Sequence, residues 1–169
     1  TYIVHARNAW LDGLSPKENR EVPPLKYEYV YRLKQEFPDL EIIINGGITT
    51  NEEIAAHLKH VDGVMVGREA YHNPMVMRDW DALFYGSSHA PITEADLVAR
   101  LYDYALSQIN AGRGTTVRHI ARHYLGLMHG LKNARSLRPI LSDAGILKPN
   151  RPELILGAWA QVAAANGFE

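Results

Sequence analysis

Three short stretches in the first half of the chain carry residue types suited to binding a phosphorylated ligand, and each follows an apolar run. They are His5-Ala6-Arg7, Asn45-Gly46-Gly47 and Gly67-Arg68. Glycines let a ligand approach the backbone closely, and free N–H groups together with an arginine fork suit phosphate oxygens. The pattern predicts a binding site for a phosphorylated cofactor. A tight turn for Gly46-Gly47, a surface ion pair for Arg68 and a structural role for His5 are the alternatives.

The elements that position these stretches alternate between strand and helix patterns. Strands are expected at residues 2–5, 41–44 and 64–66, and helices at residues 27–37 and 52–58. Thr50 and Glu53 have the spacing of a capping box at the second helix. Short buried strands that are each followed by a helix indicate a parallel α/β sheet, whose ligands bind at the carboxyl ends of the strands. We therefore expect the last βα units of an eight-stranded (β/α)8 TIM barrel, in which the loops after the final two strands often bind phosphate.

The pattern changes at Ser87, where a linker-like segment precedes a series of amphipathic helices. These helices are expected at residues 94–110, capped by Thr93, and at residues 117–131, 136–142 and 152–165. The sequence thus predicts two domains, an α/β part over residues 1–86 and a small all-α helical bundle over residues 87–169.

Composition limits the function classes. With 169 residues, of which 46% are hydrophobic, the chain can bury a core, and its net charge of −1 requires any nucleic-acid affinity to come from a local patch. The absence of cysteine excludes disulfides, thiolate metal sites and a cysteine nucleophile within these residues, and no metal site is predicted. No apolar run approaches the roughly 20 residues that span a bilayer, so a cytoplasmic protein is expected. The start, which has no initiator Met, suggests a piece of a longer chain.

One candidate patch lies in the helical part. Between positions 113 and 138 basic residues accumulate and acidic residues are absent, a pattern that favours binding to an RNA backbone over a solvated helix face. The basic residues of this stretch include Arg113, Arg118, His119, Arg122, His123, Lys132, Arg135 and Arg138.

Four segments resemble a known family. HARNAWLDGLSPKENREVPPL, INGGI, DGVMVGREAYHNP and RHIARHYLGLMHGLKNARSLR are similar to the C-terminal half of tRNA-dihydrouridine synthases of the A-type subfamily. The resemblance implies an FMN-binding βα barrel followed by a helical tRNA-binding domain. It also implies the reduction of uridines in the tRNA D-loop, with NADPH as the electron donor.

The resemblance assigns roles to individual residues. The expected FMN contacts are His5, Asn45, Gly46, Gly47, Gly67 and Arg68, and the expected tRNA contacts are Lys17, Arg20, Arg135 and Arg138. The prolines of the loop SPKENREVPPL would present its two cations at low entropic cost. The sequence departs from the family pattern at Asn8, where lysine is common, and at Pro139, where an arginine often follows the second arginine of the pair.

The implied mechanism is hydride transfer from reduced FMN to C6 of a uracil, with a proton delivered to C5 by a cysteine on an earlier part of the barrel. Because this chain has no cysteine, we expect it to be inactive alone. Three barrel strands also leave exposed edges, so the missing half of the barrel or self-association is expected to cover them. Two alternatives are a flavoenzyme for a small pyrimidine and a non-catalytic RNA-binding fragment.

Overall fold

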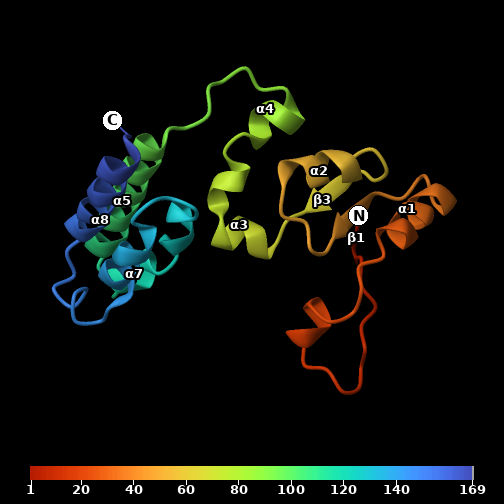
Figure 1. The fold of residues 1–169 in the computed structure, drawn as a ribbon, viewed down its shortest axis with the longest axis horizontal. Helices are drawn as coiled ribbons and strands as arrows, with labels where there is room; N and C mark the ends of the chain where they lie inside the picture. Colours follow the sequence, from red (N-terminus) through yellow and green to blue (C-terminus); the bar gives the residue numbers. More distant parts are fainter. Residues whose placement is uncertain (169) are drawn as a thin grey trace. The chain divides into compact units, whose positions relative to one another are not determined.

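The computed structural model describes residues 1–168, which fold as two compact units (Figure 1). The first unit comprises residues 1–70, and the second begins at Tyr71. The compact units therefore separate between residues 70 and 71. The domain boundary expected between residues 86 and 87 stays a prediction.

The first unit is built on a three-stranded parallel sheet. Its strands β1 (Tyr2–His5), β2 (Ile42–Asn45) and β3 (Gly63–Met65) lie in the order β1-β2-β3 (Figure 1). The register pairs His5 with Asn45, and Asn45 with Met65, so the carboxyl ends of all three strands meet at one edge. The expected strands are therefore confirmed, with β2 and β3 shifted by one residue.

Two helices support this sheet: α1 (Tyr27–Glu36) packs against β2, and α2 (Asn51–His57) packs against β3. The capping box predicted at the start of α2 is confirmed. The Thr50 hydroxyl accepts a hydrogen bond of 3.2 Å from the Glu53 N–H, and the Glu53 carboxylate accepts one of 3.1 Å from the Thr50 N–H. This reciprocal pairing satisfies two backbone donors at the helix start. It fixes the first residue of α2 just after the turn that carries Gly46 and Gly47.

The two faces of the sheet differ in burial. Ile42 and Ile44 project from one face of β2 and are fully buried. On the opposite face, Ile3 is 59% exposed and Met65 is 42% exposed. Because parallel sheets are normally covered on both faces, this open apolar face is the part of the first unit best suited to contact further protein.

The buried histidine of α2 lies in an aromatic setting. His57 is 5% exposed, its Nδ1 atom lies 2.6 Å from the Tyr31 hydroxyl, and its ring meets the Tyr27 ring edge-on with the centroids 4.4 Å apart. Burial lowers the pKa of His57 and the neighbouring His60 acts in the same direction, whereas the Glu53 carboxylate opposes them. The folded protein therefore favours the neutral imidazole at this position.

This setting predicts a pH-dependent stability. Because the folded pKa lies below the unfolded pKa, the unfolded chain binds more protons, and the stability present above about pH 6.5 is lost as the pH falls through the folded pKa of His57. Urea unfolding at pH 7.5 and 5.5 should show a lower midpoint at pH 5.5. The difference should shrink in His57→Gln and persist in His60→Gln; an equal difference in wild type and His57→Gln would contradict the assignment.

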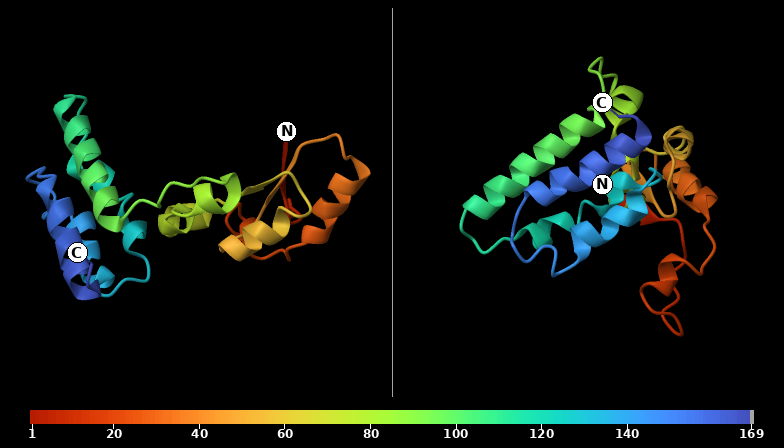
Figure 2. Two further views of the ribbon diagram at one scale, coloured as in Figure 1. Left: turned by 90° about the horizontal axis from the view of Figure 1, so that it is seen from above. Right: turned by 60° about the vertical axis from the view of Figure 1, so that its left-hand side comes forward.

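The second unit is helical, and Figure 2 shows its longer helices from two further sides. Two short helices remain before it: η1 (Glu18–Arg20) lies in the first unit, and α3 (Arg68–His72) spans the boundary between the units. The elements that follow are η2 (Pro74–Met77), α4 (Trp80–Tyr85), α5 (Glu94–Asn110), α6 (Val117–Ala121), η3 (Leu125–Met128), α7 (Ala134–Ser142) and α8 (Glu153–Asn166). Thr93 caps α5 as predicted, since its hydroxyl accepts a hydrogen bond of 3.1 Å from the Asp96 N–H. Among residues 1–168, no helix is long and apolar enough to cross a membrane.

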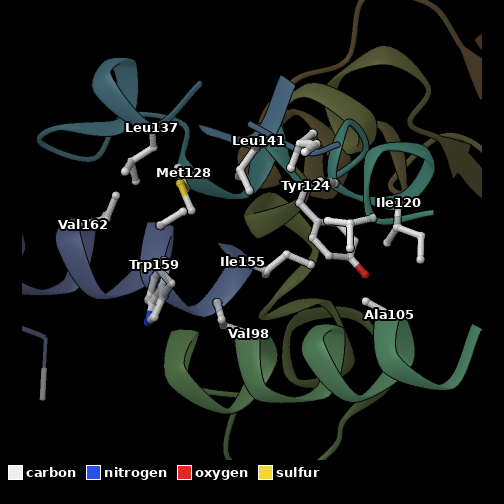
Figure 3. Close-up of a cluster of buried hydrophobic side chains, with 14 residues drawn as sticks. Val98, Ala105, Ile120, Tyr124, Met128, Leu137, Leu141, Ile155, Trp159 and Val162 are labelled. Carbon is white, nitrogen blue, oxygen red and sulfur yellow. The ribbon is translucent and has the colours of Figure 1, made fainter. Parts of the chain in front are cut away.

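The core of the second unit lies between α5, α7 and α8 (Figure 3). Leu137 of α7 and Val162 of α8 are fully buried. The buried Tyr124 turns its hydroxyl toward α5 and donates a hydrogen bond of 3.1 Å to the Leu101 carbonyl. Burial raises the pKa of Tyr124 to about 12, so this donor remains protonated at neutral pH. The segment after α6 is thereby fixed to the longest helix of the unit.

The helix predicted over residues 117–131 is wrong in its length. The structure has the short α6, a turn at residues 122–124 and the 3-10 helix η3. Gly126 explains the interruption: a Cβ added there would lie 2.6 Å from the Tyr71 carbonyl oxygen and 2.8 Å from that of His72. Close backbone contact with residues 71 and 72 therefore replaces the helical continuation.

Candidate functional site

Within the first unit, the expected cofactor residues at the ends of β1 and β2 are brought together. Gly46 is buried with φ +125°, and a Cβ at this position would lie 3.1 Å from Cε1 of His5 and 3.4 Å from the backbone nitrogen of Ala6. The parallel register places Asn45 beside His5. Only glycine fits both this conformation and this spacing, so the turn brings backbone and imidazole to one edge of the sheet.

Two supporting residues of this turn were not predicted. The Tyr27 hydroxyl donates a hydrogen bond of 2.8 Å to the Gly46 carbonyl, and burial raises the pKa of Tyr27. A Cβ on Gly47, whose φ is +69°, would lie 2.7 Å from Cδ1 of Leu25. A tyrosine at a helix start and a leucine after two prolines carry no sequence signal for this role, because it depends on contacts across the fold.

At the end of β3, Arg68 is held by the loop of residues 15–25. Its guanidinium forms an ion pair of 2.8 Å with the Glu21 carboxylate and donates a hydrogen bond of 3.4 Å to the Arg20 carbonyl. Gly67 is exposed, with open space where a Cβ would lie. The structure therefore connects the expected phosphate-binding arginine with the loop expected to contact tRNA, a connection that the sequence analysis did not anticipate.

The loop of residues 15–25 has its own hydrogen bonds and is not a free linker. The Asn19 amide accepts from the Trp10 N–H at 2.8 Å and donates to the Trp10 carbonyl at 2.9 Å. Arg7 donates to the carbonyls of Glu21 and Pro23. These bonds define the shape of the loop. The side chains of its two expected tRNA contacts, Lys17 and Arg20, are exposed and form no hydrogen bond or ion pair within residues 1–168.

The edge formed by the strand ends is electropositive. Burial lowers the pKa of His5, and the positive charges of Arg7, Arg68 and Arg20 lower it further. In addition, Arg7 Nε is buried and has no hydrogen-bond partner within the part of the chain that the structure describes. A neutral imidazole, three guanidinium groups and an unsatisfied donor fit an anionic ligand such as the phosphate of a cofactor.

The second unit contains a separate cluster, here called the basic cleft. It is a cavity of about 730 Å³ whose lining includes Arg135 and Arg138 of α7 together with Arg122. The spacing of the α7 pair places both arginines on one side of the helix, as expected. The remaining polar side chains of the lining belong to Tyr71, His72, His123 and His129, and no carboxylate lines the cleft.

The rest of the basic stretch is distributed more widely. Arg118 and His119 line a smaller cavity of about 330 Å³ that shares Arg122 with the basic cleft. Arg113 and Lys132 are exposed and line neither cavity. The expected patch is thus concentrated by the fold on three arginines, and Arg122 is the member to which the sequence analysis gave no individual role.

Comparison with known proteins places these features in a family. The family model described as "Dihydrouridine synthase (Dus)" matches residues 1–154. The chain belongs to the dihydrouridine synthase family. The resemblance expected from the four sequence segments is therefore confirmed at the level of the family.

Bacterial members of the dihydrouridine synthase family are close in sequence. A tRNA-dihydrouridine(20/20a) synthase of Escherichia coli K12 is 51% identical over 142 residues, which cover 84% of this chain and 41% of that protein. The Pseudomonas putida protein of the same name is 47% identical over 152 residues, covering 90% of this chain and 44% of the relative. The chain therefore spans less than half the length of the curated relatives that it matches.

Proposed function

We propose that this chain forms the C-terminal part of an FMN-dependent tRNA-dihydrouridine synthase that acts in the cytoplasm. The observation that carries the proposal is the combination, in one member of this family, of an anion-binding edge at His5 and Gly46 with a basic cleft free of carboxylates. In this interpretation the three strands are the last βα units of a TIM barrel. The open face of the sheet that carries Ile3 and Met65 then faces the barrel interior.

The strand ends are proposed to hold FMN. Gly46 and Gly47 leave room for the ligand at the backbone, His5 and Asn45 contact it from neighbouring strands, and Gly67 with Arg68 binds its phosphate. Bound FMN, once reduced by NADPH, supplies the hydride that saturates the C5=C6 bond of uracil. Burial, together with the charges of the nearby arginines, lowers the pKa of His5 and favours its neutral imidazole, which can accept or donate a hydrogen bond without adding positive charge.

The substrate is proposed to be a uridine in the D-loop of tRNA, held through contacts to the RNA backbone. Lys17 and Arg20 present exposed cations from the loop of residues 15–25, and Arg135 and Arg138 present theirs in the basic cleft. Contacts to phosphates position an RNA without reading its sequence, which suits an enzyme whose target base must leave its stack. The proton for C5 comes from a cysteine outside these residues, because the chain has none.

A chimeric enzyme tests this proposal. The chain would replace the matching segment of the Escherichia coli relative in a strain that lacks that relative, and dihydrouridine in tRNA would be measured by mass spectrometry. We expect the chimera to restore dihydrouridine and the 169-residue chain alone to form none. A chimera that binds flavin but leaves tRNA unmodified would contradict the tRNA function. Dihydrouridine made by the chain alone would contradict the need for an external cysteine.

A further inference from the structure

The guanidinium of Arg122 is the first member of a hydrogen-bonded chain in the basic cleft. Arg122 Nε donates to His123 Nε2 at 3.1 Å, and His123 Nδ1 lies 2.9 Å from the Tyr71 hydroxyl. All three residues line the cleft. These two hydrogen bonds fix the orientation of one guanidinium through the neighbouring His123 and through Tyr71, which lies 52 positions from His123 in sequence.

The chemistry of these groups determines where the protons lie. A guanidinium remains protonated and has no acceptor, so Arg122 can only donate, and His123 Nε2 must be the unprotonated nitrogen. The neutral ring then carries its proton on Nδ1 and donates it to the Tyr71 oxygen. The terminal N–H groups of Arg122 are therefore held in place and available to donate to a ligand with oxygen acceptors.

Close backbone packing holds Tyr71, the last member of this hydrogen-bonded series, in place. A Cβ on Gly126 would lie 2.6 Å from the Tyr71 carbonyl oxygen, and only glycine permits that approach. The contact places Tyr71 and His72 against the segment that follows Arg122. The donor arrangement is thus built into the fold of the second unit and does not depend on the chance orientation of an exposed side chain.

We propose that Arg122 is a third RNA-phosphate contact in the basic cleft and that His123 and Tyr71 are its positioning residues. This inference rests on the proposed tRNA function and extends it beyond Arg135 and Arg138. A cleft of about 730 Å³ that carries three arginines has room and donors for more than one anion. It suits consecutive phosphates of an RNA strand, because each guanidinium can bind one phosphate.

No competing negative charge weakens this arrangement. The lining of the cleft contains no carboxylate, and within residues 1–168 none of the three arginines forms an ion pair with one. Each arginine therefore adds to the attraction for phosphate, and each phosphate contact releases counterions from the RNA. The number of contacts is consequently measurable from the dependence of affinity on salt concentration.

The salt dependence of tRNA binding tests the role of Arg122. Binding of an unmodified tRNA transcript would be titrated at several salt concentrations with wild type, Arg122→Ala and the control Arg113→Ala, which removes an exposed arginine of the same stretch outside the cleft. We expect Arg122→Ala to reduce the slope of log K against log salt by about one and Arg113→Ala to change it much less. Equal slopes for wild type and Arg122→Ala would overturn the proposal.

Variants of the other two members test positioning. Tyr71→Phe and His123→Phe should each weaken binding in the wild-type background and have no further effect beside Arg122→Ala, because they act through Arg122. His123→Gln should restore much of the affinity lost in His123→Phe, since a carboxamide also presents one acceptor and one donor. Additive effects of Tyr71→Phe and Arg122→Ala would contradict the positioning role.

Two further outcomes separate this inference from the proposed function. Salt-sensitive tRNA binding that Arg122→Ala leaves unchanged would refute the third contact while the tRNA function stands. If the wild-type chain binds inorganic phosphate in the cleft and not tRNA, both the RNA contact and the tRNA function are contradicted. Circular dichroism of each variant would show that the helical unit remains folded.

Discussion

A Gly46→Ala variant is expected to be destabilised by about 2 kcal/mol relative to wild type in urea unfolding. The φ of +125° at this position lies outside the regions that alanine adopts without strain. The added methyl group would also lie 3.1 Å from the His5 ring and 3.2 Å from Cδ2 of Leu25, closer than a Cβ normally packs. The substitution should therefore displace His5 at the proposed cofactor site.

Gly67→Ala is the matched control for this prediction. Gly67 also follows a strand, but its φ is not in the left-handed region and no atom lies within 4 Å of an added Cβ. Its stability should remain within about 0.5 kcal/mol of wild type. In the chimeric enzyme, Gly46→Ala should also reduce bound flavin, measured by absorbance. Equal unfolding midpoints for the two alanine variants would contradict the assigned geometry of the turn.

The double variant Arg135→Ala/Arg138→Ala is expected to lose most of the affinity for tRNA. Each phosphate contact contributes about 0.7 to 0.9 to the slope of log K against log salt. Two lost contacts therefore correspond to roughly a 25- to 60-fold weaker binding near 0.1 M salt. Both arginines line the basic cleft, whose walls carry no carboxylate that could offset the loss of charge.

The control for the double variant removes two positive charges elsewhere in the same unit. Lys148 and Arg151 are exposed and do not line the basic cleft. Lys148→Ala/Arg151→Ala changes the net charge by the same amount, so it should weaken binding only through the overall field, which salt screens. If both double variants lost equal affinity, the cleft would have no specific role and the attraction would be that of net charge alone.

Local patterns predicted much of the fold, because the interactions that form those elements are themselves local. The capping box of Thr50 and Glu53 and the cap at Thr93 involve residues three positions apart, and both are present in the structure. The three strands also follow from short apolar runs between helices. The parallel arrangement places the carboxyl ends of the strands at one edge, and the observed register brings Asn45 beside His5.

Features that depend on contacts between distant segments were not predictable in the same way. The helix expected over residues 117–131 is interrupted because Gly126 packs against the backbone of residues 71 and 72, and the sequence shows only a glycine. The ion pair between Arg68 and Glu21 joins residues 47 positions apart. The hydrogen bonds that orient Arg122 also depend on a distant segment, since Tyr71 contacts His123 across 52 positions.

The central claim, that this chain carries a tRNA-binding surface on its helical unit, is tested most directly by a titration with unmodified tRNA at two salt concentrations. Wild type and Arg135→Ala/Arg138→Ala would be compared side by side. We predict tight binding by wild type that weakens steeply as salt rises, and a large loss of both affinity and salt sensitivity in the variant. Binding that is insensitive to salt, or equally strong in the variant, would contradict the claim.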